Sequence, residues 1–307
     1  MKPHIAVTSR SFSSNDNLRG KLLSYFDDVR FNDEGLKLEG DALVQFLEGA
    51  QGAIIGIEQV NPDVLSRLPR LRVISKFGVG LDTIDRCALD QYGIHLAHTQ
   101  GTNSVAVAEL SLMLMLAVLR RIPEAVTSVK EERWEGKPGR LLQGKKVGLI
   151  GVGNVGKALN ELLRPFDCTV FGYDASPNGV KDIQFLSLDN LLLQADIVSI
   201  HVPLTTETRG LISFRELELL SPEAIIVNTS RGGVIDEAAL LSHLIEGKLS
   251  GAGIDVFEVE PPLSWELAHH PRVFATPHIA GTSLESNIAM GQAAIDGLIS
   301  NMDRLIG

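Results

Sequence analysis

The chain has few cysteines, no long uncharged apolar run and no excess of positive charge. Only Cys87 and Cys168 occur among its 307 residues. Two cysteines are too few for a disulfide framework, so a reducing compartment, the cytoplasm, is expected. The most apolar stretch, 105–119, contains Glu109 and is shorter than the ~20 residues that span a bilayer. We therefore expect a core helix there and no membrane segment, and the N-terminus lacks the apolar run of a secretory signal.

The charge balance argues against a nucleic-acid partner. Lys and Arg total 28 against 38 Asp and Glu, which gives a net charge of −10. An acidic surface repels phosphate backbones, so nucleic-acid binding is not expected as a main function. Apolar residues still make up 44% of the chain, enough for a sizeable core, and the length corresponds to about two domains. Low-complexity tracts and short repeats are also lacking.

Short apolar runs alternating with helical patterns are what the sequence does contain. The predicted strands are 4–8, 53–57, 72–75, 146–150, 169–173, 197–201, 225–228, 253–256 and 273–275, and the predicted helices are 41–47, 62–68, 104–119, 155–163 and 188–194. Asn61 and Pro62 supply the cap and first position of one of these helices. Such alternation predicts parallel sheets covered by helices on both faces.

The order of these runs predicts a discontinuous domain. The C-terminal stretch 283–305 has a helical period and is expected to return to the first series of strands. We therefore predict an α/β fold with two doubly wound parallel-sheet domains. A Rossmann nucleotide-binding domain, residues 102–281, is inserted into a substrate domain built from residues 1–101 and 282–307.

A glycine-rich turn predicts the cofactor site. Residues 151–156 read GVGNVG, which follows a predicted strand directly and opens a predicted helix. Gly151 permits the tight turn, Gly153 lets the backbone approach a pyrophosphate, and Gly156 allows the helix to pack closely on the strand. The helix N-terminus offers N–H groups and partial positive charge to phosphates. The bare pattern also occurs in ordinary tight turns, but this context favours a dinucleotide.

Asp174 predicts which dinucleotide is bound. It ends the next predicted strand, close to the ~20-residue spacing of dinucleotide folds. A carboxylate there accepts hydrogen bonds from the ribose hydroxyls and repels a 2′-phosphate, and the following Ala175 and Ser176 supply no Arg to bind one. We therefore expect NAD rather than NADP. The alternative is that Asp174 is only a helix cap or a turn residue.

Three polar residues follow predicted strands of the second series: Arg231, Glu260 and His278. Ligands of open α/β sheets bind at the carboxyl ends of the strands. An Arg fork can bind a carboxylate and polarise an adjacent carbonyl, a His can exchange a proton, and a carboxylate can orient the ring and favour imidazolium. Taken singly, each residue has an ordinary structural alternative. Arg231 is then a surface ion-pair partner, Glu260 a loop carboxylate and His278 a solvated or structural histidine. Together with the glycine turn they predict hydride chemistry on a 2-oxo acid, without a metal site.

Five segments make the chain resemble the D-isomer-specific 2-hydroxyacid dehydrogenases over nearly its whole length. They are KFGVGLDTID (76–85), VGLIGVGNVG (147–156), VSIHVPLTTETRGLI (198–212), VNTSRGGVIDEAAL (227–240) and GIDVFEVEPP with TPHIAG (253–262, 276–281). The resemblance implies that Arg231 binds substrate, Glu260 is the orienting carboxylate and His278 is the acid/base.

The resemblance also implies contacts to the cofactor and the substrate. The implied cofactor contacts are Gly151, Gly153, Asn154, Val155, Gly156, Asp174, His201, Pro203, Thr208, Thr229, Ser230, Asp255 and Gly281. Lys76, Gly78, Val79 and Gly80 are implied on the substrate side, with the amides of Val79 and Gly80 holding the substrate carboxylate opposite Arg231. The alternative for Gly78 and Gly80 is that they only turn the chain.

The exact acid is predicted less directly. The overall pattern is most similar to short phosphoglycerate dehydrogenases of serine biosynthesis, which makes 3-phosphoglycerate the expected substrate. Candidate phosphate contacts are Arg10, Ser11 and Lys76, although Arg10 is equally consistent with a solvated loop residue. The alternative is a glyoxylate or hydroxypyruvate reductase. Formate dehydrogenation is disfavoured, because that related group places Gln at the position of Glu260.

Two further expectations concern partners. An alternative of another class is an NAD-sensing corepressor, but the extended tails typical of such proteins are not evident. The resemblance implies a homodimer, with the helix at 104–119 contributing to the interface. The alternative is that this helix is buried within one subunit.

Overall fold

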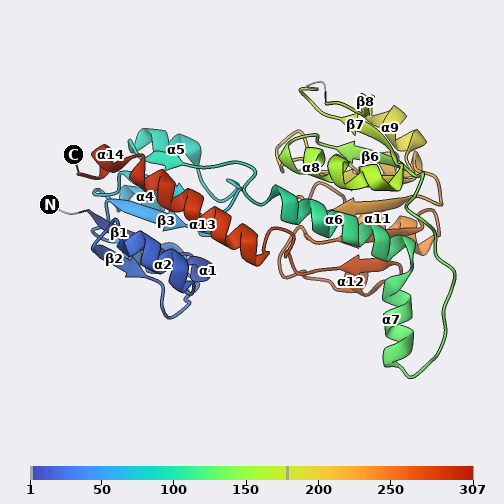
Figure 1. Ribbon diagram of the computed structural model, residues 1–307, viewed down its shortest axis with the longest axis horizontal. Coiled ribbons are helices and arrows are strands. Elements are labelled where there is room, and N and C mark those ends of the chain that lie inside the picture. Colours follow the sequence, from blue (N-terminus) through green and yellow to red (C-terminus); the bar gives the residue numbers. More distant parts are fainter. Residues whose placement is uncertain (1–2, 178–179, 307) are drawn as a thin grey trace. The chain divides into compact units, whose positions relative to one another are not determined.

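The computed structural model describes residues 3–177 and 180–306 and divides the chain into two compact units (Figure 1). Unit 1 consists of Met1–Asn103 and Thr282–Gly307, and unit 2 consists of Ser104–Gly281. Each unit contains one parallel sheet with helices packed on it. The predicted fold class, α/β with two parallel-sheet domains, is confirmed.

Unit 1 has a five-stranded sheet in the order β2-β1-β3-β4-β5, with every pair parallel. Its strands are β1 (His4–Val7), β2 (Asp28–Phe31), β3 (Gly52–Ile55), β4 (Val73–Lys76) and β5 (His95–Ala97). Its helices are α1 (Arg10–Ser13), α2 (Asp16–Leu23), α3 (Gly40–Leu47), α4 (Pro62–Ser66), α5 (Arg86–Gln91), α13 (Leu284–Ile299) and α14 (Met302–Ile306). β3 and β4 are buried along their whole length, as a strand covered on both faces must be.

The C-terminal segment completes unit 1. Helix α13 packs on β4, with smaller contacts to β3 and β5. Ser75 Oγ donates a hydrogen bond of 2.7 Å to Ala294 O, and a Cβ on Gly297 would lie 2.5 Å from that hydroxyl. A glycine is therefore needed for the helix to approach the strand this closely.

Unit 2 has a seven-stranded sheet in the order β12-β11-β10-β9-β6-β7-β8, also entirely parallel. Its strands are β6 (Lys146–Ile150), β7 (Thr169–Tyr173), β8 (Ile183–Phe185), β9 (Ile197–Ile200), β10 (Ile225–Asn228), β11 (Gly251–Ile254) and β12 (Val273–Ala275). Its helices are α6 (Ser104–Leu119), α7 (Ile122–Lys130), α8 (Asn154–Leu163), α9 (Leu188–Gln194), α10 (Phe214–Glu218), α11 (Glu237–Ile245) and α12 (Glu266–His269), with a 3₁₀ turn at Arg164–Phe166. The chain starts at β6, builds outward to β8 and then returns to β9 on the other side. The point where the strand order reverses is where such sheets bind ligands.

Helix α6 belongs to unit 2 and packs against its other elements. It packs on α8, β10 and β11, and Leu114 sits so close to β11 that a Cβ on Gly253 would lie 2.9 Å from the Leu114 Cβ. Eight of its 16 residues are buried. In the described parts of the chain, no helix is long and apolar enough to cross a bilayer.

Candidate active site

The three predicted catalytic side chains come together at one edge of the unit 2 sheet. Strands β10, β11 and β12 are neighbours, and their carboxyl ends lead into the segments that carry Arg231, Glu260 and His278 respectively. Because the strands are parallel, these three segments emerge side by side. The sheet thus gathers residues that are far apart in the sequence.

A short contact joins Glu260 to His278. Glu260 Oε2 lies 2.7 Å from His278 Nδ1, and Glu260 Oε1 accepts a hydrogen bond of 3.1 Å from the Phe257 amide. The side chains are 38% and 46% exposed respectively. With Nδ1 held by the carboxylate, Nε2 is the nitrogen that can exchange a proton with a bound molecule.

The two groups shift each other's pKa in the direction that favours an ion pair. The hydrogen bond to Glu260 raises the pKa of His278 above its ordinary value, although burial and the charge of Arg231 oppose this. Burial acts to raise the pKa of Glu260, but its hydrogen bond to His278 and the charges of His278 and Arg231 outweigh it, so this pKa is lowered. His278 is therefore more readily protonated than an ordinary histidine.

The loop that carries Arg231 is braced by its own side chains. Asn228 Nδ2 donates to Arg231 O at 2.9 Å, and Asn228 Oδ1 accepts from Ser230 N at 3.0 Å and from Ser230 Oγ at 2.8 Å. Thr229 is buried, and its hydroxyl lies 2.7 Å from Ser111 Oγ on α6. The guanidinium of Arg231 is close enough to influence the pKa of both Glu260 and His278.

Asp255 holds the loop that carries His278. It is 1% exposed, and its Oδ1 accepts from Thr276 Oγ1 at 2.6 Å and from Ile279 N at 2.9 Å. Its Oδ2 accepts from Ala280 N at 2.9 Å, in the residue before Gly281. The family resemblance implies only a cofactor contact for Asp255, whereas both of its side-chain oxygens accept hydrogen bonds from the segment 276–280.

The glycine-rich turn has the geometry of a phosphate cradle. Gly151 has φ +92°, and a Cβ on it would lie 2.8 Å from the His201 carbonyl. A Cβ on Gly156 would lie 2.4 Å from Gly151 O, whereas nothing lies within 4 Å of the Cβ position of Gly153. Gly153 immediately precedes α8, whose first residues are Asn154 and Val155. An open approach to the N–H groups of a helix N-terminus fits a pyrophosphate.

Asp174 lies at the carboxyl end of β7 and touches this turn. Its Oδ2 accepts a hydrogen bond of 2.8 Å from Val152 N, and its Oδ1 accepts one of 2.9 Å from Ser176 N. The bond from Ser176 N is typical of an aspartate in a turn, which is one of the alternatives for Asp174. The bond from Val152 N ties the carboxylate to the turn between Gly151 and Gly153, where it can also meet a ribose.

The other residues implied to contact the cofactor follow β9. Thr208 Oγ1 donates to Pro203 O at 2.6 Å, so the loop closes on itself. Burial lowers the pKa of His201 to about 3, and its Nε2 lies 2.9 Å from Ser199 Oγ. The ring is therefore neutral and bonded to its own strand rather than available as an acid.

The residues implied on the substrate side belong to unit 1, at the carboxyl end of β4. Gly78 has φ +123°, and Val79 O lies 2.8 Å from His98 Nε2. Lys76 is buried, and its ammonium donates to Gly56 O. Glu58 accepts a hydrogen bond of 2.7 Å from Gly56 N, so the loop after β3 that Lys76 contacts also carries a carboxylate.

The candidate phosphate contacts in unit 1 are not gathered into a cation cluster. Arg10 is exposed on α1, and its Nε donates to Leu36 O at 3.2 Å. Ser11 follows it on the same helix. Within residues 3–177 and 180–306, no group of three or more His, Cys, Asp or Glu could hold a metal ion.

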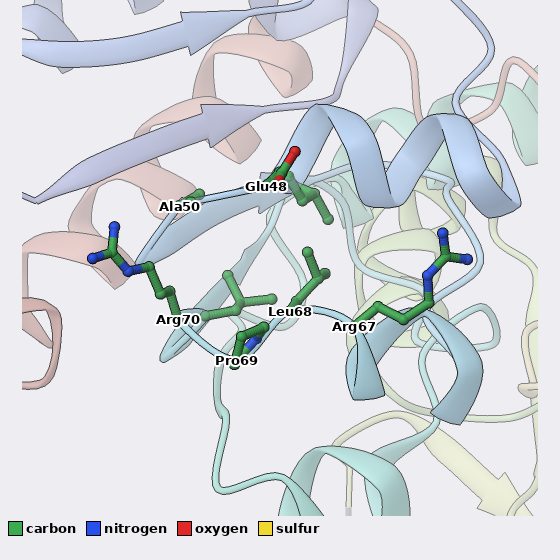
Figure 2. Close-up of a pocket in the computed structure, with 9 residues that line it drawn as sticks. Glu48, Ala50, Arg67, Leu68, Pro69 and Arg70 are labelled. Carbon is green, nitrogen blue, oxygen red and sulfur yellow. The ribbon is translucent and has the colours of Figure 1, made fainter.

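A cavity of about 400 Å³ in unit 1 lies away from these residues. It is lined by residues 47–50 and 67–71, which precede β3 and β4, whereas Gly78 follows β4. Figure 2 shows the side chains of Arg67 and Arg70 extending in opposite directions from it. Arg67 pairs with Asp41 at 2.7 Å. The cavity is therefore at the amino end of the strands, not at the edge where the site residues lie.

Ser111 and Gly232 support the site but were not predicted from the sequence. Ser111 lies in an apolar helix, where a buried hydroxyl is itself a signal of a specific hydrogen-bond partner. Gly232 was grouped with its neighbours, yet its Cβ would lie 1.9 Å from Phe257 O. That contact is between backbones of two loops and has no signature in the sequence beyond the glycine.

Comparison with known proteins agrees with this geometry. Residues 112–280 match the family model described as D-isomer specific 2-hydroxyacid dehydrogenase, NAD binding domain. The chain is 36% identical to the hydroxypyruvate reductase of Thermotoga maritima, over 86% of this chain and 89% of that protein. It is 37% identical to the D-3-phosphoglycerate dehydrogenase of Archaeoglobus fulgidus over 79% of this chain, but spans only 47% of that protein. The solved TT0316 protein of Thermus thermophilus superposes with a TM-score of 0.87 at 33% identity, covering 98% of this chain and 97% of that one.

Proposed function

The chain belongs to the D-isomer specific 2-hydroxyacid dehydrogenases, which are NAD-dependent oxidoreductases, and from this premise we propose that Arg231, Glu260 and His278 reduce a small 2-oxo acid. The contact of 2.7 Å between Glu260 and His278 carries the proposal. A carboxylate bound to Nδ1 keeps the ring oriented and favours its protonated form. Arg231 on the neighbouring loop supplies the charge that a substrate carboxylate needs.

The roles follow from the chemistry of each side chain. NAD(H), when bound at the glycine-rich turn, supplies or accepts the hydride. In reduction, His278 donates the Nε2 proton to the carbonyl oxygen of the substrate, and Glu260 stabilises the imidazolium beforehand. In oxidation, neutral His278 takes the hydroxyl proton instead. Arg231 binds the carboxylate and polarises the carbonyl beside it.

The substrate we favour is an unphosphorylated acid such as glyoxylate or hydroxypyruvate. Relatives of both names match this chain at similar identity, 36% and 37%, so the preference rests on the residues of unit 1. In unit 1 the Lys76 ammonium donates to Gly56 O, in the loop after β3 that also carries the Glu58 carboxylate. A buried carboxylate disfavours a phosphate nearby. The second candidate, 3-phosphoglycerate, is favoured by the segment 76–85 and by the exposed guanidinium of Arg10.

A substrate panel tests this proposal. Glyoxylate, hydroxypyruvate and pyruvate are assayed with NADH and NADPH, and 3-phosphoglycerate is assayed with the oxidised coenzymes. We expect turnover of glyoxylate or hydroxypyruvate with NADH, and a His278→Gln variant that loses about 10²- to 10⁴-fold in kcat while keeping its affinity for NADH. Binding of NADH without turnover of any acid would instead support the corepressor alternative.

We also propose that the protein is a homodimer, with an interface other than the expected one. Eight residues of α6 are buried within unit 2, which supports the alternative that this helix is internal. Helix α7 and the following segment 131–141, together called the arm, expose more apolar surface. Its exposed large apolar residues are Ile122, Val126, Val129, Trp134 and Leu141, and Figure 1 shows α7 projecting from the rest of unit 2.

A further inference from the structure

Two loops of the active site meet backbone to backbone. Gly232 follows Arg231, and its Cβ would lie 1.9 Å from Phe257 O and 2.4 Å from Glu258 N. No other residue type fits there unless one of the loops moves. The loop of Arg231 and the loop of Glu260 are therefore placed relative to each other by direct contact.

Glu237 makes a second connection between these loops. It is the first residue of α11, and the preceding Asp236 caps the helix by accepting from Ala239 N at 3.0 Å. With that amide already satisfied, Glu237 Oε1 accepts a hydrogen bond of 2.5 Å from Glu258 N. A carboxylate at the N-terminus of a helix is also stabilised there. The bond holds the backbone two residues before Glu260.

The side-chain contact beside this bond is weaker. Arg209 lies 3.3 Å from the Glu258 carboxylate, and both side chains are 59% exposed. Exposed pairs of this kind contribute little to a fixed geometry. Glu237 is partly buried, so its bond to the Glu258 amide is the more constraining of the two.

We propose that Glu237 is a positioning residue, which fixes the Glu258 backbone so that Glu260 meets His278 Nδ1. The proposal rests on the proposed function only in assigning catalysis to that pair. Glu237 contacts the backbone of the Glu260 loop and acts through it. The absence of a side chain at Gly232 allows the two loops to approach this closely, and the hydrogen bond from Glu258 N to Glu237 holds them at that distance.

Several carboxylates face Glu237, so its own charge matters as well. Burial raises the pKa of Glu237, and the charges of Glu258, Asp236 and Glu260 raise it further, against the effect of the Glu258 amide. Removing the side chain thus changes both a hydrogen bond and a nearby negative charge. A test has to separate these two effects.

Three variants separate them: Glu237→Ala removes the bond and the charge, Glu237→Gln keeps an acceptor oxygen without the charge, and Glu237→Asp keeps the charge on a shorter side chain. We expect Glu237→Ala and Glu237→Asp to lose about 10- to 100-fold in kcat, because a misplaced catalytic group costs that much, with KM changed less. Glu237→Gln retains most of the activity. If Glu237→Ala does not fold, Glu237→Asp supplies the same test.

A second readout does not require turnover. The pKa of His278, followed by NMR titration without substrate, is expected to fall toward its ordinary value in Glu237→Ala and to stay raised in Glu237→Gln. Glu258→Ala is the matched control, because it removes the exposed carboxylate but keeps the amide that Glu237 holds. An unchanged pKa of His278 in Glu237→Ala would overturn the proposal. Because this readout needs no substrate, it stands even if the proposed activity is wrong.

Discussion

The imidazole of His278 is held by a carboxylate through one nitrogen, while the structure gives the other no hydrogen-bond partner among the described residues. The backbone of His278 has φ +53°, a conformation that residues other than glycine seldom adopt. It is maintained by the bond of 2.8 Å from His278 N to Asp255 O and by the bonds from the neighbouring amides to the Asp255 carboxylate. A strained backbone that surrounding contacts hold in place is typical of functional sites.

The raised pKa of His278 predicts the pH dependence of a Glu260→Gln variant. In the proposed mechanism reduction requires protonated His278, so its rate is full below this pKa and is lost as the pH rises through it. Without the charge of Glu260 the pKa falls toward its ordinary value, because the largest cause of the shift is gone. The alkaline limb of kcat/KM for reduction should move to lower pH, and the acidic limb of the oxidation should move in the same direction.

The measurement is kcat/KM against pH with saturating coenzyme in both directions. Glu258→Gln is a suitable control, because this nearby carboxylate is exposed and does not touch the ring. Identical profiles for Glu260→Gln and the parent protein would show that Glu260 does not set the pKa of the group that transfers the proton.

At the scale of elements, two glycines of the glycine-rich turn have different roles: Gly156 is required for packing, whereas Gly153 is expected to allow a phosphate to approach. A Cβ on Gly156 would lie 2.4 Å from a backbone oxygen, so Gly156→Ala should destabilise the protein by about 1–3 kcal/mol, the usual cost of overpacking. Gly153 has φ −76° and open space at its Cβ position. Gly153→Ala should therefore keep the melting temperature of the parent but weaken NADH binding.

Thermal unfolding and a fluorescence titration with NADH give the two quantities. A Gly153→Ala variant that binds NADH as tightly as the parent would mean that no phosphate approaches this turn. A Gly156→Ala variant with an unchanged melting temperature would contradict the packing argument instead.

The interior strands could all be predicted from the sequence, together with one edge strand, β12, whose run VFA is apolar. Strands such as β6 and β10 are buried on both faces and give continuous apolar runs, so they were predicted with the bounds observed. The strands that were missed are β2, β5 and β8, which all lie at sheet edges. Edge strands are short, and β2 (DVRF) alternates between exposed and partly buried residues, so no apolar run marks them.

The residue types of the site and the sheet edge where they lie could be predicted from the sequence, but the hydrogen bonds between its loops could not. Polar residues after successive parallel strands meet at one edge whatever the loops do, which is why Arg231, Glu260 and His278 were found. The bond from Glu237 to a backbone amide and the inward role of Asp255 depend on loop conformation. A loop that needs φ +53° at a histidine cannot be derived from local propensity.

At the scale of the whole molecule, the arm carries several exposed apolar side chains of unit 2. The chain has only two tryptophans, and Trp134 on the arm is 95% exposed. Val129 on α7 is 58% exposed. Apolar and aromatic side chains gathered on a projecting segment mark a protein interface, and a second copy of this chain presents the same surface, as a two-fold dimer requires.

The proposed dimer predicts a mass twice the 33.2 kDa of one chain in light scattering at micromolar concentration. Replacing Val129 and Trp134 together by Glu should weaken association, because a buried aromatic anchor contributes about 2 kcal/mol or more, which is ~30-fold in Kd. Leu193→Glu is the matched control, since Leu193 is 60% exposed on α9 and outside the arm. If the double variant keeps the mass of the parent while Leu193→Glu becomes monomeric, the interface lies elsewhere on unit 2 and the arm has another purpose.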